Sequence, residues 1–327
     1  MDIVFVGDVM LGRLVNQDLK TKPPDYPWGD TLPIFQKADF RICNLECVIS
    51  NRGTPWSVTP KVFHFRSDAK NIEVLREARI DAVSLANNHI LDFEYEAMFD
   101  TLRLLKDASI RHAGAGMNIS EASHATIFQV GKANLGFIAF TDNEPEWEAT
   151  DQHPGVFYVP IDVNDMRAQR LFEIVRRAKA EVELLIASAH WGPNWGYSPP
   201  AEHTRFARAL IDAGCDVVFG HSGHVFRGIE FYRGRSIIYC AGNFIDDYAV
   251  DEVERNDQSF IFVVEIRNGL IQGLKLYPTV IRDFQASLAT GLEREKIVEK
   301  MQQLCAAFDT RTDWQKAGYL TLGYDAG

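Results

Sequence analysis

The amino-acid sequence predicts an α/β fold built on a mainly parallel sheet. Over the first two-thirds of the chain, short apolar runs alternate with segments in which apolar residues recur every three or four positions. This alternation of strands and amphipathic helices is typical of a parallel sheet whose faces are covered by helices. The chain has 327 residues, 46% of them hydrophobic, so it can bury the core of one large domain or two smaller ones.

The predicted elements alternate along this part of the chain. Strands are predicted at residues 3–6, 40–44, 82–86, 135–140, 184–189 and 217–219. Helices are predicted at residues 94–108, 163–179 and 201–213. In the helix at 163–179, the spacing of apolar residues predicts that Met166, Leu171 and Val175 face inward.

After Gly228 the sequence becomes β-rich. Further strands are predicted at 229–232, 237–239, 260–266 and 270–276. Asn268-Gly269 predicts a tight hairpin between the last two strands. A final helix is expected at 292–308, so we expect one domain over residues 1–285 and a C-terminal helix and tail, residues 286–327, packed on the same domain.

Composition and charge restrict the partners and the cellular compartment. With 34 basic and 45 acidic residues, the net charge of −11 disfavours binding to nucleic acid or to an anionic membrane. The chain begins directly with a strand-like segment and has no run close to the ~20 apolar residues of a membrane span. We therefore expect a cytoplasmic protein without a membrane span or a nucleic-acid partner. The five cysteines form no CxxC pair, which favours buried free thiols.

Side chains suited to metal binding or proton transfer follow five of the predicted strands, where each strand ends. They are Asp8, Glu46, Asn88 with His89, His190, and His221 with His224. Ligands of open α/β sheets bind at the carboxyl ends of the strands, so these groups are expected at one edge. Carboxylates, an amide and imidazoles without a thiolate suit a divalent cation such as manganese, iron, zinc, magnesium or calcium, and not a structural zinc site.

Several of these residues have a simpler interpretation. Asp8 could cap a turn, Glu46 could be a solvated surface carboxylate, and Asn87 is interpreted as a turn residue. His221 and His224 could be two exposed rings on a tight turn. His89 and Asp92, three positions apart, could form an oriented acid–base pair or a contact at the start of a helix.

Three more residues lie beside these positions in the sequence. Arg13, Trp191 and Arg227 are candidates for binding an anionic substrate, because arginine recognises carboxylates and phosphates. The alternative is that the aromatic residue braces a loop and the arginines pair with surface acids.

The motifs resemble those of the CapA family of capsule or poly-γ-glutamate synthesis proteins, which is related to calcineurin-like metallophosphoesterases. They are Gly-Asp-Val-Met-Leu-Gly-Arg at 7–13, Asn-Leu-Glu at 44–46, Ala-Asn-Asn-His-Ile-Leu-Asp at 86–92, His-Trp-Gly at 190–192 and Gly-His-Ser-Gly-His-Val at 220–225. The resemblance runs in order from residue 1 to about residue 250. It implies a four-layer α/β/β/α sandwich of the metallophosphoesterase type that holds two metal ions.

The resemblance also implies roles for the residues. The metal ligands would be Asp8, Glu46, Asn88, His190, His221 and His224, with Glu46 bridging the two ions and His89 acting beside the second ion. Together with the pair of His89 and Asp92, Asp8 and His224 are the candidate catalytic residues. The sequence departs from the phosphoesterase pattern at Met10, where a histidine is usual. It also departs in the spacing of His221 and His224, so which of these two binds metal stays open.

Three functions are compatible with this sequence. The first is a metal-dependent hydrolase that cleaves a phosphoester or a peptide or γ-glutamyl amide bond, with a link to poly-γ-glutamate metabolism. The second is a metal-dependent peptide epimerase in which Asp8 and a histidine exchange a proton at an α-carbon. The third is a non-catalytic member that binds a polyanion. In each case the expected partner is an anionic small molecule or peptide.

Overall fold

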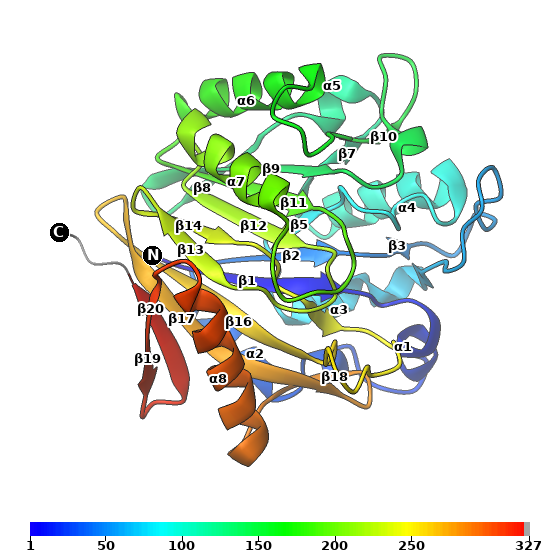
Figure 1. Ribbon diagram of the computed structural model, residues 1–327. Coiled ribbons are helices and arrows are strands. Elements are labelled where there is room, and N and C mark those ends of the chain that lie inside the picture. The colour runs from blue at the N-terminus through cyan, green and yellow to red at the C-terminus, as the bar shows by residue number, and fades with distance from the viewer. Residues whose placement is uncertain (324–327) are drawn as a thin grey trace.

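The computed structural model describes residues 1–323, which form two facing β-sheets with helices on both outer sides (Figure 1). The larger sheet runs in the order β19 (Arg311–Gln315), β20 (Tyr319–Gly323), β17 (Leu270–Arg282), β16 (Gln258–Arg267), β1 (Asp2–Val9), β2 (Phe40–Leu45), β5 (Ala82–Ser84) and β6 (Arg111–Ala113). Strand β15 (Asn243–Ile245) pairs with β1, and β18 (Gln285–Leu288) pairs with β17. The four neighbouring strands β1, β2, β5 and β6 of this larger sheet are parallel, as predicted for the sheet.

The smaller sheet lies against the larger one. Its order is β13 (Ile229–Tyr232), β14 (Arg235–Ile238), β12 (Val217–His221), β11 (Leu184–His190), β9 (Ala133–Thr141) and β8 (Thr126–Val130). Two short pairs lie outside the sheets: β3 (Val48–Ile49) with β4 (Arg66–Ser67), and β7 (Ala115–Gly116) with β10 (Gly155–Val156).

Helices complete the outer layers. The larger sheet is covered by α1 (Arg13–Asp18), α2 (Leu32–Lys37), α3 (Ile72–Glu77) and α4 (Glu94–Asp107), and the smaller sheet by α5 (Ile119–Ala122), α6 (Met166–Lys179) and α7 (Ala201–Ala213). Short 3₁₀ helices occur at Tyr26–Thr31, Ala69–Asn71 and Pro145–Trp147. Along β1, Ile3 and Phe5 face the core between the sheets while Val4 and Val6 face the helices, as the two-residue period of a strand requires. The predicted four-layer α/β/β/α sandwich is confirmed.

The C-terminal segment joins the same core. Helix α8 (Gly291–Ala306) places Ile297 and Met301 in the apolar cluster between the sheets, and β20 pairs with β17. The hairpin of β19 and β20 was not predicted, because its sequence shows no clear alternation. Residues 324–327 of the predicted tail lie outside the described residues.

The structure also tests the predictions for single residues. The five cysteines are buried and unpaired, and the Asn268-Gly269 turn has positive φ at both residues, so both predictions are confirmed. The inward position of Met166 was wrong: its side chain is 87% exposed, because α6 begins there, directly after the capping residue Asp165. Within residues 1–323, no helix combines the length and apolarity needed to cross a membrane.

Candidate metal centre

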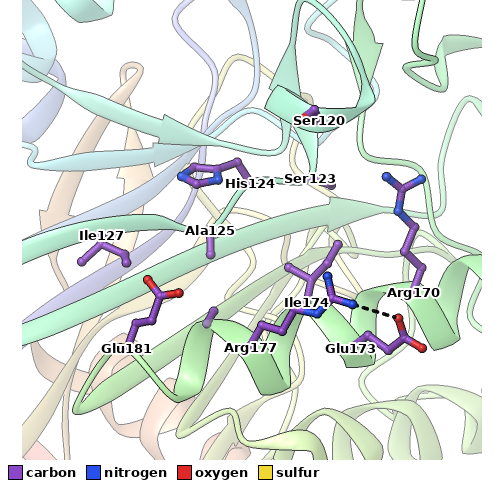
Figure 2. A pocket seen from close by; sticks show the side chains of 11 residues that line it. Ser120, Ser123, His124, Ala125, Ile127, Arg170, Glu173, Ile174, Arg177 and Glu181 are labelled. Atoms are coloured by element: carbon purple, nitrogen blue, oxygen red, sulfur yellow. Dashed lines mark ion pairs between the residues drawn. The ribbon is translucent and has the colours of Figure 1, made fainter.

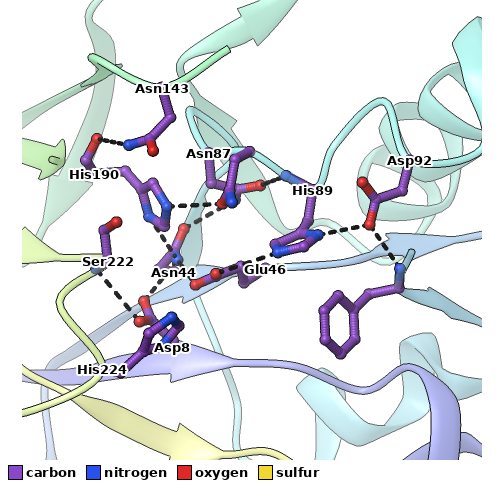
Figure 3. A network of polar contacts seen from close by, with 12 residues as sticks. Asp8, Asn44, Glu46, Asn87, His89, Asp92, Asn143, His190, Ser222 and His224 are labelled. Atoms are coloured by element: carbon purple, nitrogen blue, oxygen red, sulfur yellow. Dashed lines mark hydrogen bonds and ion pairs between the residues drawn. The ribbon is translucent and has the colours of Figure 1, made fainter. Parts of the chain in front are cut away.

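The carboxyl ends of strands from both sheets bring the predicted polar residues together (Figure 3). In the larger sheet, Asp8 of β1 lies beside Asn44 of β2 in the parallel register. In the smaller sheet, His190 of β11 lies beside His221 of β12 in the same way. Because the two sheets face each other, these two pairs meet across the interface between them.

Asp8, His190 and His221 form the centre of this cluster. All three are fully buried, and one potential ligand atom from each lies within 4.8 Å of the others. His190 Nδ1 and His221 Nδ1 are 2.8 Å apart, and His221 Nδ1 is 3.7 Å from Asp8 Oδ1. Burial lowers the pKa of His221 to about 4 and that of His190 well below its usual value, so both rings are neutral at neutral pH.

The donor set of this cluster fits a divalent cation. His190 Nε2 faces the side-chain oxygen of Asn88 at 3.0 Å, an acceptor, so Nε2 carries the ring proton and Nδ1 is left with a free lone pair. That lone pair points toward His221 Nδ1 and lies beside the Asp8 carboxylate. A carboxylate oxygen and two imidazole nitrogens converging at a buried point are ligands suited to manganese, iron or zinc.

Asn44 and Glu46 extend the cluster from β2. The Asn44 amide nitrogen donates to Asp8 Oδ1 at 2.8 Å and to Glu46 Oε2 at 2.9 Å, and Asn87 donates to the Asn44 oxygen at 3.0 Å. Burial and the nearby charge of Asp8 raise the pKa of Glu46 well above its usual range. Glu46 is therefore a buried member of the site and not a solvated surface carboxylate. Asn87 braces the neighbouring strand end through its side chain.

His89 and Asp92 form the oriented pair that their spacing allowed. His89 Nδ1 lies 2.6 Å from Asp92 Oδ2, which also accepts a hydrogen bond from the backbone N–H of Phe65 at 2.6 Å. The other ring nitrogen, Nε2, lies 3.8 Å from Glu46 Oε1. Burial lowers the pKa of His89, although the Asp92 carboxylate acts in the opposite direction. The ring can thus be held in one orientation with one nitrogen turned toward the cluster.

His224 and Met10 occupy the positions where the sequence departs from the phosphoesterase pattern. His224 lies on the turn after β12 and has a positive φ of 58°. Its Nδ1 lies 3.0 Å from Asn243 Oδ1, and Asn243 of β15 is the register partner of Asp8 in β1. His221, not His224, belongs to the group of three converging ligand atoms. Met10 packs in the apolar core between the larger sheet and its helices.

A cavity of about 580 Å³ opens above the cluster. Its walls include Asn88, His89 and His224, together with Arg13 and Lys61. Sequence reasoning missed Lys61, which comes from the long loop before β4. The Lys61 ammonium donates to the backbone oxygen of Asn88 at 2.5 Å and to Glu144 Oε1 at 2.9 Å, and it lies 3.5 Å from Asp92 Oδ1.

The three candidate substrate-binding residues separate in the structure. Arg13 lines the cavity, with its Nε 3.2 Å from Asp247 Oδ2. Trp191 and Arg227 are fully buried instead and do not line it. The Trp191 indole donates to the backbone oxygen of Tyr239, and Arg227 donates to three backbone carbonyls of the loop at residues 193–196. The position of Trp191 corresponds to the bracing interpretation. Arg227 pairs with no surface acid and instead braces the loop at residues 193–196, where its enclosed guanidinium cannot reach a ligand.

Comparisons with known proteins agree with the motifs. The family model described as "Bacterial capsule synthesis protein PGA_cap" matches residues 2–248. A Mycobacterium tuberculosis protein named "Probable polyglutamine synthesis accessory protein" is 31% identical over 319 residues, covering 93% of this chain and 83% of that relative. The Bacillus subtilis PGA biosynthesis protein CapA is 29% identical over 245 residues, covering 74% of this chain and 62% of that relative.

Among solved structures, a hypothetical protein from Thermus thermophilus has a similar fold. Its TM-score is 0.51 at 16% sequence identity, with 85% of this chain and 98% of that chain covered. Since the family model spans most of the chain and the motifs that it covers build the buried cluster, the chain belongs to the bacterial capsule synthesis protein family PGA_cap, the family of the CapA proteins.

Proposed function

We propose that the protein is a divalent-metal-dependent hydrolase that cleaves a phosphoester or amide bond in an anionic substrate linked to poly-γ-glutamate metabolism. The observation that carries this proposal is the buried convergence of Asp8, His190 and His221 at the strand ends. The metabolic link comes from the names of the relatives, which refer to PGA biosynthesis and to polyglutamine synthesis.

Asp8, His190 and His221 would hold the first cation. Glu46, Asn88 and His224 lie around the same point and are the further donors available for a second one. A bound divalent cation supplies Lewis acidity, which polarises a phosphoryl or carbonyl oxygen and lowers the pKa of water.

The other residues would bind the substrate and move protons. Asp92 fixes the His89 ring and partly offsets the burial that lowers its pKa, so that His89 Nε2 would carry a proton to the leaving group. Arg13, on the cavity wall, would pair with an anionic group of the substrate. The cavity volume of about 580 Å³ suits a small molecule or the end of a peptide.

Metal analysis combined with turnover tests the proposal. Purified protein should contain a transition metal, and the metal-loaded protein should hydrolyse an aryl phosphoester or a γ-glutamyl peptide. The His89→Asn variant should keep its metal and lose turnover by roughly 10²–10⁴-fold, since it lacks only the proton donor. The His190→Ala variant should lose both metal and turnover.

The alternatives give different results in the same experiment. A metal-loaded protein that cleaves neither class of substrate contradicts hydrolysis. Incorporation of solvent deuterium at an α-carbon without cleavage identifies an epimerase. Substoichiometric metal after careful purification favours a non-catalytic member of the family.

A further inference from the structure

Three cavities away from the metal centre lie next to one another and share lining residues. The first lies between α4 and β6, the second over β6 and β8, and the third between β8 and α6, with volumes of about 1050, 400 and 590 Å³. The first and second share Arg111, His112 and Glu121, and the second and third share Ser120 and His124. We call the combined surface the lateral trough.

The lateral trough crosses the edge of the sandwich and not the end where the metal centre lies. Strands β6 and β8 are the outermost strands of the two sheets on this side. The Thr126 hydroxyl of β8 donates to the backbone oxygen of His112 in β6 at 2.8 Å, so the floor is continuous between the sheets. The residues that line the trough differ from those that line the metal-centre cavity. Occupancy of the trough therefore does not obstruct the cavity.

The walls of the lateral trough are cationic, although the whole chain carries a net charge of −11. Their charged residues, histidine aside, are Arg103, Lys106, Arg111, Arg170 and Arg177 against Glu121, Glu173 and Glu181. Arg103 pairs with acids of α4, and Arg177 pairs with Glu173. Within residues 1–323, Lys106, Arg111 and Arg170 have no acidic partner within ion-pair distance. Lys106 lines the first cavity, Arg111 lies where the first and second cavities meet, and Arg170 lines the third.

Apolar side chains line both ends of the trough beside the cations. Phe99, Leu102, Ile110 and Met117 line the end at α4, and Met117 is 46% exposed. At the other end, Figure 2 shows Ile127 of β8 and Ile174 of α6 in the wall that also carries Arg170 and Arg177. A ligand with carboxylates on short aliphatic stems would match both features, because its stems can cover apolar surface while its charges pair with the cations.

We propose that the lateral trough binds an extended polycarboxylate polypeptide. The elongated shape calls for a linear ligand, and the spaced unpaired cations call for repeated negative charges along it. Nucleic acid fits less well, because its phosphates carry no aliphatic stems that could cover the apolar residues of the trough. This proposal rests on the proposed function in one respect only: the link to poly-γ-glutamate metabolism is what would bring such a polymer to the protein. Binding of the polymer to the trough requires no hydrolysis.

Fluorescence anisotropy with labelled poly-L-glutamate tests this site on the metal-loaded full chain. The wild-type protein should bind the polymer, and the affinity should fall as salt is added. The Lys106→Glu, Arg170→Glu double variant should bind about tenfold more weakly, because exposed ion pairs each change an equilibrium by a few-fold and reversal adds repulsion. A Lys20→Glu, Lys37→Glu double variant makes the same charge change at exposed positions outside the trough and should bind like the wild type.

Additional measurements distinguish a failure of this proposal from a failure of the proposed hydrolase function. The His190→Ala variant should bind the polymer with wild-type affinity, whatever its turnover, because His190 is not part of the trough lining. Circular dichroism should show that every variant is folded. Absent binding by the wild-type protein, equal weakening in both double variants, or tighter binding of single-stranded DNA than of poly-L-glutamate would each overturn the polycarboxylate site.

Discussion

Replacing Lys61 with methionine should destabilise the protein by about 3 kcal/mol, since removing one partner of a buried charge pair costs roughly 3–5 kcal/mol. The Lys61 side chain is 7% exposed, and its ammonium faces the backbone oxygen of Asn88, Glu144 and the fully buried Asp92. Methionine keeps most of the volume but offers no donor, so all three acceptors lose a partner. We choose the lower end of the range because the Glu144 side chain is 24% exposed and can recruit water.

Urea denaturation of the metal-free protein measures this free energy of unfolding directly. The matched control is Arg76→Met, which removes an ion pair with Glu73 that lies 3.0 Å apart on the surface, with side chains 57% and 47% exposed. The control should lose no more than about 1 kcal/mol. If Lys61→Met and the control lose the same amount, the Lys61 contacts do not hold the loops of the site together.

Four further results are expected. Adding Mn²⁺ or Zn²⁺ at about 100 times its Kd should raise the free energy of unfolding by about 2.7 kcal/mol; differential scanning calorimetry should show no such shift for His221→Ala. Burial lowers the pKa of His203 to about 3, whereas the unfolded chain has a pKa of about 6.5 at this residue. Below a pH of about 6.5 the unfolded chain therefore binds a proton that the folded protein does not, and the free energy of unfolding falls as the pH falls. Relative to His203→Phe, the wild-type protein should therefore lose about 1.4 kcal/mol per pH unit below that point in urea titrations, and equal slopes would contradict this. Arg227→Met should speed amide exchange at residues 193–197 by mass spectrometry while leaving metal affinity unchanged, because Arg227 holds that loop and no ligand. The raised pKa of Glu46 predicts that metal binding releases a proton at neutral pH, detected as a dependence of the calorimetric enthalpy on the buffer.

The main strands and helices could be predicted because their apolar periodicity reflects one dominant constraint, burial against a neighbouring layer. Helix α7 has the predicted limits, and β2 and β11 each differ by one residue at one end. The short elements escaped prediction for a physical reason. The two-residue strands β3 and β4 and the hairpin of β19 and β20 owe their existence to pairing with distant segments, which leaves no local period.

The sequence predicted those residues of the site that directly follow a strand, but not the residues that reach it from elsewhere. Residues that directly follow an apolar run, such as Asp8 and His190, could be identified because the strand end fixes their position. Asn44 was quoted in the motif but not assigned a role, although it stands beside Asp8 in the register and donates to both carboxylates of the cluster. Lys61 could not have been found from the sequence, since its three partners come from loops that only the tertiary fold brings together.

The charges of the site explain why these residues belong together. Asp8, Glu46 and Asp92 are buried carboxylates, and a buried charge is costly unless it is paired or neutralised. Lys61 faces Asp92, and Asn44 can offer only neutral hydrogen bonds to the other two. Without further positive charge, Glu46 must therefore take up a proton, as its raised pKa indicates. A divalent cation between Asp8 and the two neutral histidines would remove that requirement, so cation binding and the ionisation of Glu46 are two parts of one equilibrium.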